Sequence, residues 1–246
     1  GTLLWGLRLS GIDYRNNDNT VTIEQLSSRW DLLPLLYRQF NLESLHISGL
    51  TAAWQAPADD GDQSDPFAFL PLPVSIRLND VQLSDSQIIY DEEQYPVDSL
   101  QFSALLSGDR LELEQLALQG LALGDGVIDI SSQISLQLVE ALPVEARVRW
   151  SYLGPIHDQI DSASGLLHAS GTIDSALVEH QLEAPVRVHS TGKLVTGLTD
   201  PDSGTRTALA VDFIHTLQQQ TLPIDVVSGL QFDGFSVHTA GGFNDL

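Results

Sequence analysis

Side chains that could carry out chemistry are spread thinly along the sequence. The seven histidines stand at positions 46, 157, 168, 180, 189, 215 and 238. The stretch closest to a metal site is "HDQID" at 157–161, where an imidazole and two carboxylates could hold a cation weakly. A solvated loop accounts for the same residues, and we interpret the stretch in that way.

Other motifs also fall short of a functional site. "DDGDQSD" at 59–65 lacks the acid, glycine and glutamate spacing of a calcium loop. "STGKL" at 190–194 has Leu194 where a phosphate-binding loop needs Ser or Thr. Acid pairs such as Asp59 and Asp60 could serve a glycosidase, but the four tryptophans lie in apolar contexts that favour core packing over glycan binding. We therefore predict that the chain is not an enzyme and needs no cofactor and no metal.

The elements that must position any site are β-strands. Three stretches alternate apolar and polar residues, namely "VIDISSQISLQLV" at 127–139, "PVEARVRW" at 143–150 and "LEAPVRV" at 182–188. Successive side chains of a strand point to opposite faces, so each stretch has one apolar and one polar face, as in half-buried antiparallel strands. The residues predicted to line the apolar face are Ile128, Ile130, Ile134, Leu136, Leu138, Val144, Val148, Trp150, Leu182, Val186 and Val188.

A nine-residue frame recurs, with apolar residues at its first, fourth, sixth and ninth positions and glycine at its eighth. It occurs at 4–12, 42–50, 113–121 and 227–235, which places Gly11, Gly49, Gly120 and Gly234 at the same step. In "LESLHISGL" at 42–50, the step of three from Leu42 to Leu45 predicts a bulge, after which Leu45 and Ile47 point to the apolar face. Gly49 allows a kink before the next strand. We interpret the frame as a corner where a continuous sheet bends.

One helix is predicted near residues 31–39, with Asp31 as its cap and Pro34 in its first turn. Its wide apolar stripe must be covered, so we expect it to plug the end of a sheet. The rest reads as about eighteen short strands, either in one sheet or in a two-sheet sandwich. The polar loop "APADDGDQSDP" at 56–66 could subdivide the chain.

Composition excludes several classes of partner. The net charge is −22, and Lys193 is the single lysine, so the clustered cations of a nucleic-acid-binding protein are missing.

Cysteine is absent, so the chain has no disulfides and no thiolate metal sites. No stretch approaches 18 uninterrupted apolar residues, so this piece spans no membrane. Methionine is also absent, even at position 1, and we expect the sequence to be part of a longer protein.

Most of the chain resembles the N-terminal half of the TamB proteins of Gram-negative bacteria. The resemblance is carried by the order of five segments: "GTLLWGLRLSGIDY" at 1–14, "VTIEQLSSRWDLLPLLYRQFNLESLHISGL" at 21–50, "LPLPVSIRLNDVQL" at 70–83, "SGDRLELEQLALQGL" at 107–121 and "SASGLLHASGTIDSALVEHQLEAPVRVHSTGKL" at 162–194.

The resemblance implies a periplasmic, β-rich body, similar to AsmA-like proteins and to bridge-like lipid transfer proteins. It also implies an inner-membrane anchor before Gly1 and a C-terminal region that docks on the outer-membrane barrel protein TamA, both outside this sequence. The expected fold class is all-β, with an elongated antiparallel sheet curled into a groove with an apolar interior. On this basis residues 1–246 form one periplasmic groove segment.

Three functions are compatible with the sequence, the first two with the expected groove and the third with the alternation of apolar residues alone. The first is a conduit that shields phospholipid acyl chains between the inner and outer membranes and so supports outer-membrane biogenesis. The second is a scaffold that works with TamA in the assembly or secretion of outer-membrane β-barrel proteins and autotransporters by β-augmentation. The third is a closed β-sandwich that serves as a spacer or an adhesion domain.

Overall fold

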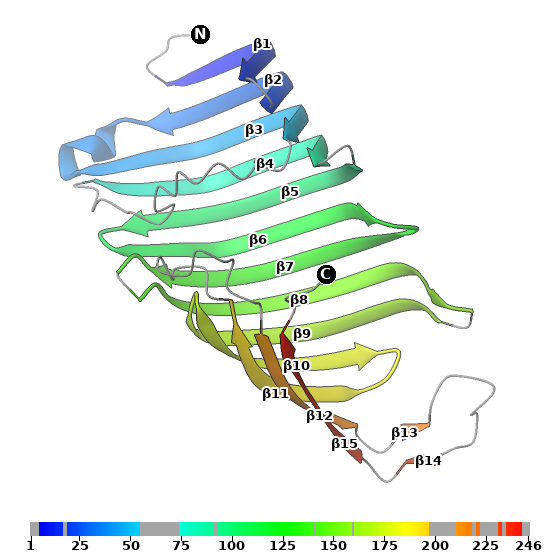
Figure 1. Cartoon of the computed structure of the whole chain (residues 1–246). Coiled ribbons are helices and arrows are strands. Elements are labelled where there is room, and N and C mark those ends of the chain that lie inside the picture. Colours follow the sequence, from blue (N-terminus) through cyan, green and yellow to red (C-terminus); the bar gives the residue numbers. More distant parts are fainter. Residues whose placement is uncertain are drawn as a thin grey trace. The chain divides into compact units, whose positions relative to one another are not determined.

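The chain folds almost entirely into β-strands (Figure 1). The structure, a computed structural model, describes residues 5–16, 19–54, 74–90, 93–139, 141–158, 160–196, 210–217, 220–221, 231–232 and 235–242. The strands are β1 Gly6–Asn16, β2 Asn19–Asp31, β3 Gln39–Trp54, β4 Ser75–Tyr90, β5 Glu93–Ser107, β6 Arg110–Leu123, β7 Gly126–Gln137, β8 Pro143–His157, β9 Ile160–Thr172, β10 Ser175–Ala184, β11 Val188–Val195, β12 Ala210–Leu217, β13 Gln220–Thr221, β14 Gln231–Phe232 and β15 Phe235–Gly242.

Thirteen of these strands form one sheet in the order β1 to β12 followed by β15, and the sheet does not close into a barrel. The short strands β13 and β14 pair with each other. The predicted all-β fold class is therefore confirmed. Among the printed pairings of the described strands, all are antiparallel except β3 with β4, which run parallel, and this parallel pair was not predicted. The sandwich alternative needs two packed sheets, whereas the described strands form one large sheet and a two-stranded ribbon.

The chain divides into two compact units, residues 1–131 and residues 132–246. In the first unit, β1 to β6 pair in sequence order, and in the second, β8 to β12 and β15 do the same. The loop at 56–66, where the sequence allowed a subdivision, lies outside the described residues.

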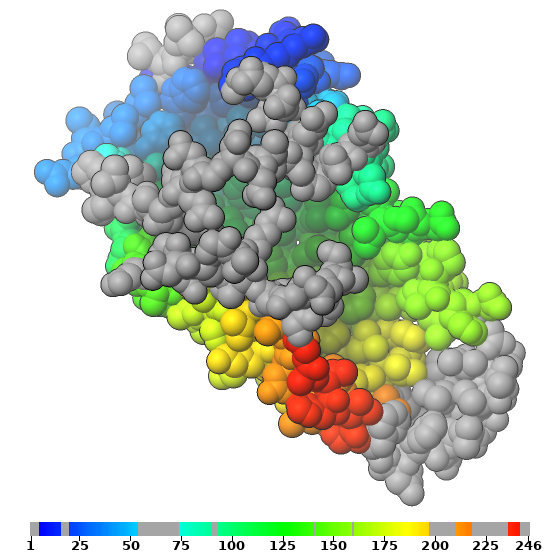
Figure 2. All heavy atoms as spheres, viewed as in Figure 1, coloured from blue at the N-terminus to red at the C-terminus, as the bar shows by residue number. Residues whose placement is uncertain are grey.

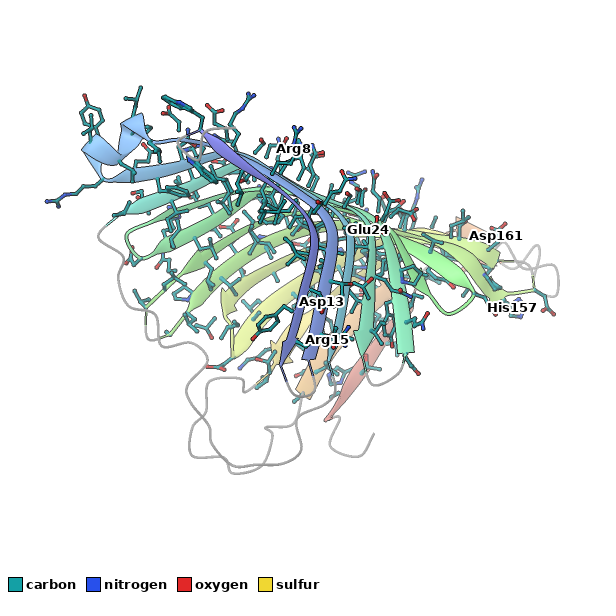
Figure 3. The ribbon with its side chains drawn as sticks, turned by 90° about the horizontal axis from the view of Figure 1, so that it is seen from above. Arg8, Asp13, Arg15, Glu24, His157 and Asp161 are labelled. Carbon is teal, nitrogen blue, oxygen red and sulfur yellow. The ribbon has the colours of Figure 1, made fainter. Side chains whose placement is uncertain are left out.

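Glycines of the recurrent frame stand where strands bend in the first unit. Gly11, Gly49 and Gly120 all have a positive φ, of 63°, 63° and 68°, a conformation that glycine adopts without steric cost. In Figure 3, β1 turns between the labelled residues Arg8 and Asp13, on either side of Gly11. The predicted kink is confirmed at these three positions, and Gly234 lies outside the described residues. Each glycine bends one long strand instead of separating two strands, so these strands are longer than the short strands that the sequence suggested.

The predicted bulge at the start of the frame is also present. Arg29 of β2 pairs with Ser44, and its neighbour Trp30 pairs with Leu42, which leaves Glu43 as the extra residue. An equivalent shift leaves Glu114 extra between β5 and β6. The bulge restores Leu45 and Ile47 to the face that Leu42 occupies, as the pattern of apolar residues predicted.

The strand β4 contains a variant of the frame that the sequence search missed. Leu78, Val81 and Leu83 keep the apolar positions, and the ladder shifts between Leu78 and Val81. Asp85 takes the glycine position and has a positive φ of 50°. Aspartate is one of the few residues that enter this region, so a frame written for glycine alone was too narrow.

The predicted helix is present only as a short 3₁₀ helix, η1 Leu33–Tyr37, between β2 and β3. Asp31 accepts a hydrogen bond from the Leu33 amide, although the N-cap residue is Leu32. The expectation that its apolar surface is covered was wrong, because Leu36 is 81% exposed and Tyr37 is 86% exposed. A 3₁₀ helix of five residues is too short to present the wide apolar stripe that was predicted for an α-helix.

The stretch at 182–188 is not one strand, contrary to prediction. β10 ends at Ala184 and β11 begins at Val188, and Leu182 pairs with Val188 across the turn. Pro185 has no N–H group to contribute to a ladder, so a turn at this point costs no hydrogen bond. The spacing of apolar residues concealed this turn, because Leu182 and Val188 face the same way on either side of it.

Candidate functional site

The apolar side chains of the first unit form rows that cross the strands. The register places one member of each strand directly beside the next, and we call the series composed of leucines and one isoleucine the leucine row. It consists of Leu9, Leu26, Ile47, Leu83, Leu100 and Leu118 from β1 to β6. A second row runs beside it and contains Leu7, Ser28, Leu45, Val81, Phe102 and Leu116. Together they make a nearly unbroken aliphatic surface on one face of the sheet.

The second unit repeats this arrangement on β8 to β15. One row contains Ala146, Ala169, Val178, Gly192, Phe213 and Thr239, and another contains Trp150, Gly165, Leu182, Val188 and Leu217. The row between these two runs through Val148, Leu167, His180, Ser190, His215 and Val237. The opposite face carries Glu145, Arg147, Arg149, Glu179, Lys193 and Asp212, all exposed. We call the two aliphatic surfaces the apolar face of each unit.

These apolar faces are only half-buried. Among the described residues, no large side chain is less than 2% exposed, and the buried hydrophobic residues number just seven, among them Val81 at 3% and Leu142 at 4%. A packed interior normally buries large aliphatic side chains completely. The apolar faces therefore retain exposed hydrocarbon surface along several strands, which is typical of a surface that binds an apolar partner.

The residues predicted to line an apolar face all lie within described segments, and each is half-buried. Leu45 and Ile47 belong to the two rows of the first unit, and Val144, Val148, Trp150, Leu182 and Val188 belong to rows of the second. Ile128, Ile130, Ile134 and Leu136 lie on alternate positions of β7, whose intervening residues are mostly exposed. Leu138 follows the end of β7, and Val186 lies in the turn between β10 and β11, so neither stands on a strand. Their role in binding stays a prediction.

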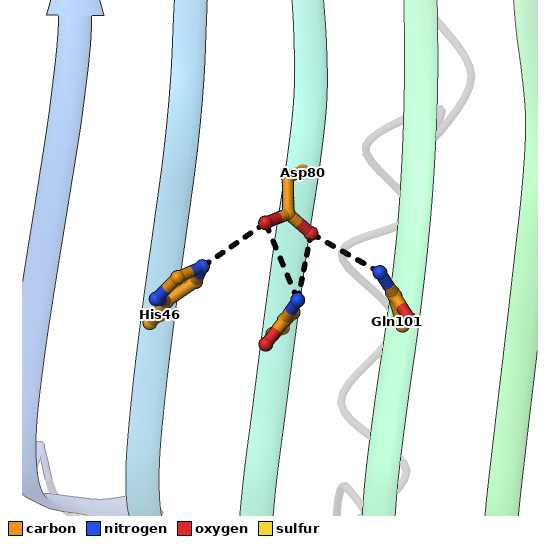
Figure 4. A network of polar contacts seen from close by, with 4 residues as sticks. His46, Asp80 and Gln101 are labelled. Carbon is orange, nitrogen blue, oxygen red and sulfur yellow. Dashed lines mark hydrogen bonds and ion pairs between the residues drawn. The ribbon is translucent and has the colours of Figure 1, made fainter.

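The polar face of the first unit has its own network, centred on Asp80 of β4 (Figure 4). Its carboxylate is 3.1 Å from His46 Nε2 and accepts hydrogen bonds from the amides of Gln82 and Gln101, on β4 and β5. The hydrogen bond with His46, the largest contribution, lowers the pKa of Asp80 below its ordinary 3.8. A depression of about 780 Å³ lies beside this network, and its lining includes serine and glutamine residues such as Ser27, Ser48 and Gln101. Five members of the leucine row also line it, namely Leu9, Leu26, Ile47, Leu83 and Leu100. The network joins side chains of three neighbouring strands, and we interpret its role as stabilising the pairing of these strands.

Replacing Asp80 with asparagine is expected to destabilise the first unit slightly at neutral pH, by less than about 1 kcal/mol, because the carboxylate is partly exposed. A lowered pKa means that this contribution is present above the unfolded pKa and is lost as the pH falls through the lower folded pKa. Urea unfolding of the parent and variant at several pH values checks the prediction. The two stabilities should differ at pH 7 and converge as the pH falls well below 3.8, the ordinary pKa of Asp80, and a constant difference would contradict the role of charge.

The sequence motifs with possible metal or catalytic chemistry that lie in the described part of the chain do not form a site. His157 and Asp161 lie exposed at the end of the β8–β9 hairpin (Figure 3), and the described part of the chain contains no group of three possible metal ligands. The acidic stretch at 59–65 lies outside the described residues. The motif at 190–194 is a regular part of β11, with Lys193 directed to the polar face opposite Asp212.

Sequence reasoning missed two histidines on the apolar face of the second unit. His180 and His215 pair in register with Ser190, which lies between them on β11. Each histidine occupies an apolar position of its strand, in the series Val178, His180, Leu182 and in the series Phe213, His215, Leu217. Alternation could have revealed them, because each histidine continues the apolar positions of its strand, two residues from the apolar residue on either side.

These features correspond to a known family. A family model described as "TamB, N-terminal domain" matches residues 1–174. The chain belongs to the TamB family. TamB proteins take part in outer-membrane assembly in the cell envelope, where they work with TamA, and the family is one of transport or assembly proteins. No curated protein and no solved structure shows significant similarity to the chain. Among the described residues of this TamB-family chain, no helix is long and apolar enough to cross a membrane.

Proposed function

We propose that the apolar faces of this TamB-family chain hold phospholipid acyl chains and shield them from water between the inner and outer membranes. The observation that carries the proposal is the half-exposed aliphatic surface formed by the cross-strand rows. Six strands contribute to the leucine row, and each contributes a side chain of similar size and chemistry. Because the side chains along this surface are alike, they define no single position at which a hydrocarbon chain must end.

The energetics favour binding of an acyl chain without fixing its position along the row. Each methylene group removed from water contributes about 0.8 kcal/mol, whichever aliphatic side chain covers it. An acyl chain can therefore move along a row without losing a specific contact. The net charge of −22 opposes the binding of anionic headgroups to the polar face and so makes the apolar face the favoured place for lipid.

In the longer protein, we propose that an anchor in the inner membrane precedes this segment and that a later region docks on TamA. The segment then lies in the periplasm as part of a conduit. Phospholipid is its cargo, and the chain supplies shielding without carrying out a reaction.

A photoreactive amino acid at Leu136 or Val186 is expected to capture phospholipid in cells. Both side chains are half-buried, and Leu136 lies on the alternating apolar positions of β7. Gln137 is the matched control, since it is the adjacent residue and is exposed. Mass spectrometry of the crosslinked adducts, and of lipid retained by the purified protein, identifies the cargo. Capture of outer-membrane protein alone, with no lipid, would contradict a conduit.

An assembly scaffold is the second candidate, and the open sheet is the observation that favours it. Among the described strands, β1 pairs with β2 alone and β15 pairs with β12 alone. Figure 2 shows the red atoms of β15 beside the orange atoms of β12. A strand with one neighbour offers backbone groups to an incoming strand of a barrel protein or autotransporter. Crosslinks to such substrates from β1 or β15, rather than from the apolar face, would support this function.

A further inference from the structure

The apolar face of the second unit contains a polar interruption, which we call the histidine row. It crosses the strands through Val148, Leu167, His180, Ser190, His215 and Val237. The rows on either side contain no charged residue at any of their described positions. Burial of polar side chains on an apolar surface is unfavourable unless they are hydrogen-bonded, so their presence needs a reason.

His180 is held by Trp150 of β8. The indole Nε1–H donates a hydrogen bond to His180 Nε2 over 3.2 Å, and the two rings stack with centroids 5.9 Å apart. Gly165 of β9 lies beneath the pair, where an added Cβ would come within 2.9 Å of His180 Nε2 and 3.0 Å of Trp150 Nε1. The glycine therefore provides the space in which the two rings meet.

His215 is held in a similar way. Its Nδ1 is 2.8 Å from the Ser190 hydroxyl, its Nε2 contacts the Thr239 hydroxyl, and its ring stacks on Phe213. Gly192 lies beneath Phe213, because an added Cβ would be 2.7 Å from Phe213 Cγ. Two histidines that are each stacked on an aromatic ring above a glycine form a built arrangement on the sheet.

The hydrogen bonds of the two histidines leave one ring N–H group available as a donor. Trp150 can only donate, so His180 Nε2 must be its acceptor, and the proton of the neutral ring must be on Nδ1. No described residue accepts a hydrogen bond from this Nδ1–H, whereas both ring nitrogens of His215 have hydroxyl partners. His180 can therefore offer a hydrogen bond to a ligand that lies on the apolar face.

We propose that His180, next to Ser190 and Trp150, binds the phosphate group of a phospholipid whose acyl chains lie on the surrounding apolar rows. This inference rests on the proposed lipid-holding function and adds a headgroup site to it. A phosphate oxygen accepts hydrogen bonds and carries the charge that an imidazolium attracts. In a chain of net charge −22, these three rows offer two imidazoles with no carboxylate beside them.

Binding at this site is coupled to a proton. Burial, and secondly the nearby His215, lowers the pKa of His180 below its ordinary 6.5, so the ring is neutral at neutral pH when no ligand is present. The only titratable groups in the three rows are His180 and His215, and His215 has its two hydroxyl partners. A bound phosphate favours the imidazolium form and thus raises the pKa of His180. Phospholipid binding should therefore tighten as the pH falls from 8 to 6.

Protonation also changes the contact with Trp150. An imidazolium donates from both nitrogens, so its Nε2 can no longer accept the indole hydrogen bond. The indole must then shift or find another acceptor. Lipid binding at low pH should for this reason change the fluorescence of Trp150, measured in a variant with the other three tryptophans replaced by phenylalanine.

Titration calorimetry of the purified 246-residue chain tests the proposal with three probes. Dihexanoylphosphatidylglycerol supplies phosphate and acyl chains, dihexanoylglycerol supplies acyl chains alone, and inorganic phosphate supplies the anion alone. The phospholipid is expected to bind more tightly at pH 6 than at pH 8, while the diacylglycerol binds equally at both. His180→Phe should weaken phospholipid binding by about tenfold at pH 6 and leave diacylglycerol binding unchanged, as expected for the loss of one charge-assisted hydrogen bond. His189→Phe is the matched control on the neighbouring strand, because its side chain lies on the polar face near Glu179.

The outcomes distinguish the headgroup site from the lipid-holding function. Binding of both lipids with equal affinity and no dependence on pH would overturn the headgroup site and leave the lipid-holding face intact. Binding of neither lipid would overturn the lipid-holding function and this site with it. If inorganic phosphate bound as tightly as the phospholipid, the site would be one for free phosphate, and the assignment to a lipid headgroup would be wrong. The pH dependence of the parent chain provides a test that does not depend on the folding of the His180 variant.

Discussion

Leu83→Arg is expected to reduce the phospholipid retained by the purified chain by about tenfold, because it places a charge in the middle of the leucine row. Leu83 pairs with Ile47 on one side and with Leu100 on the other, so a guanidinium here interrupts the aliphatic surface from both directions. Since Leu83 is half-exposed, the arginine can direct its charged end to solvent and the strand can stay paired. Lipid content by mass spectrometry and the melting temperature by circular dichroism measure the two effects separately.

Gln82→Arg is the matched control for this experiment. Gln82 is the preceding residue of β4, its side chain lies on the polar face, and an arginine there can still donate to Asp80. Lipid retention should match that of the parent chain. Equal loss in the two variants would show that charge on β4 disturbs the fold, and an unaffected Leu83→Arg would show that the leucine row does not bind lipid.

Gly120→Ala is expected to be the most destabilising alanine substitution among the three described frame glycines. The residue has a φ of 68°, which costs a residue with a Cβ about 1–2 kcal/mol. A Cβ at this position would also lie 2.5 Å from Cβ of Asp98 on β5, an atom that cannot move without its backbone. Gly11 has nearly the same φ but nothing within 4 Å of an added Cβ, so Gly11→Ala should show the backbone cost alone. Urea unfolding of both variants measures the difference.

Removing the opposing side chain separates the two costs at Gly120. In a double variant with Asp98→Gly, the steric clash disappears while the backbone cost remains. The stability lost through Gly120→Ala should then be smaller in the Asp98→Gly background than in the parent chain. If it is the same in both backgrounds, the clash is relieved by a movement of β5 and the bend is softer than its geometry suggests.

Much of the fold could be predicted because its pattern is local. Alternation in β7 and β8 depends on residues two apart, and the bend at Gly49 depends on a glycine and a step of three within nine residues. These features follow from which face a side chain must occupy. The apolar face was predictable for the same reason, although which of its residues bind a ligand does not follow from alternation.

Other features could not be predicted from the alternation of apolar and polar residues. They depend on contacts between segments that are distant in the sequence, or on the chemistry of individual side chains. The parallel pairing of β3 with β4 is a choice between strand partners, and neither strand's sequence specifies it. The turn after Ala184 was hidden because its two flanking residues face the same way. His180 and His215 are 35 positions apart in the sequence, and only the register through Ser190 places them in one row.

The bends of the first unit have a further consequence for how such a protein changes length. Each of β1 to β6 makes its main contacts with its immediate neighbours, and β1, β3, β4 and β6 each carry a positive-φ residue at an equivalent step. Each of these bends thus arises from a residue of its own strand and does not depend on packing around a common core. A stack of this kind can gain or lose a hairpin by duplication or deletion while the remaining strands keep their register. The number of strands in the sheet can therefore change by two at a time in the course of inheritance.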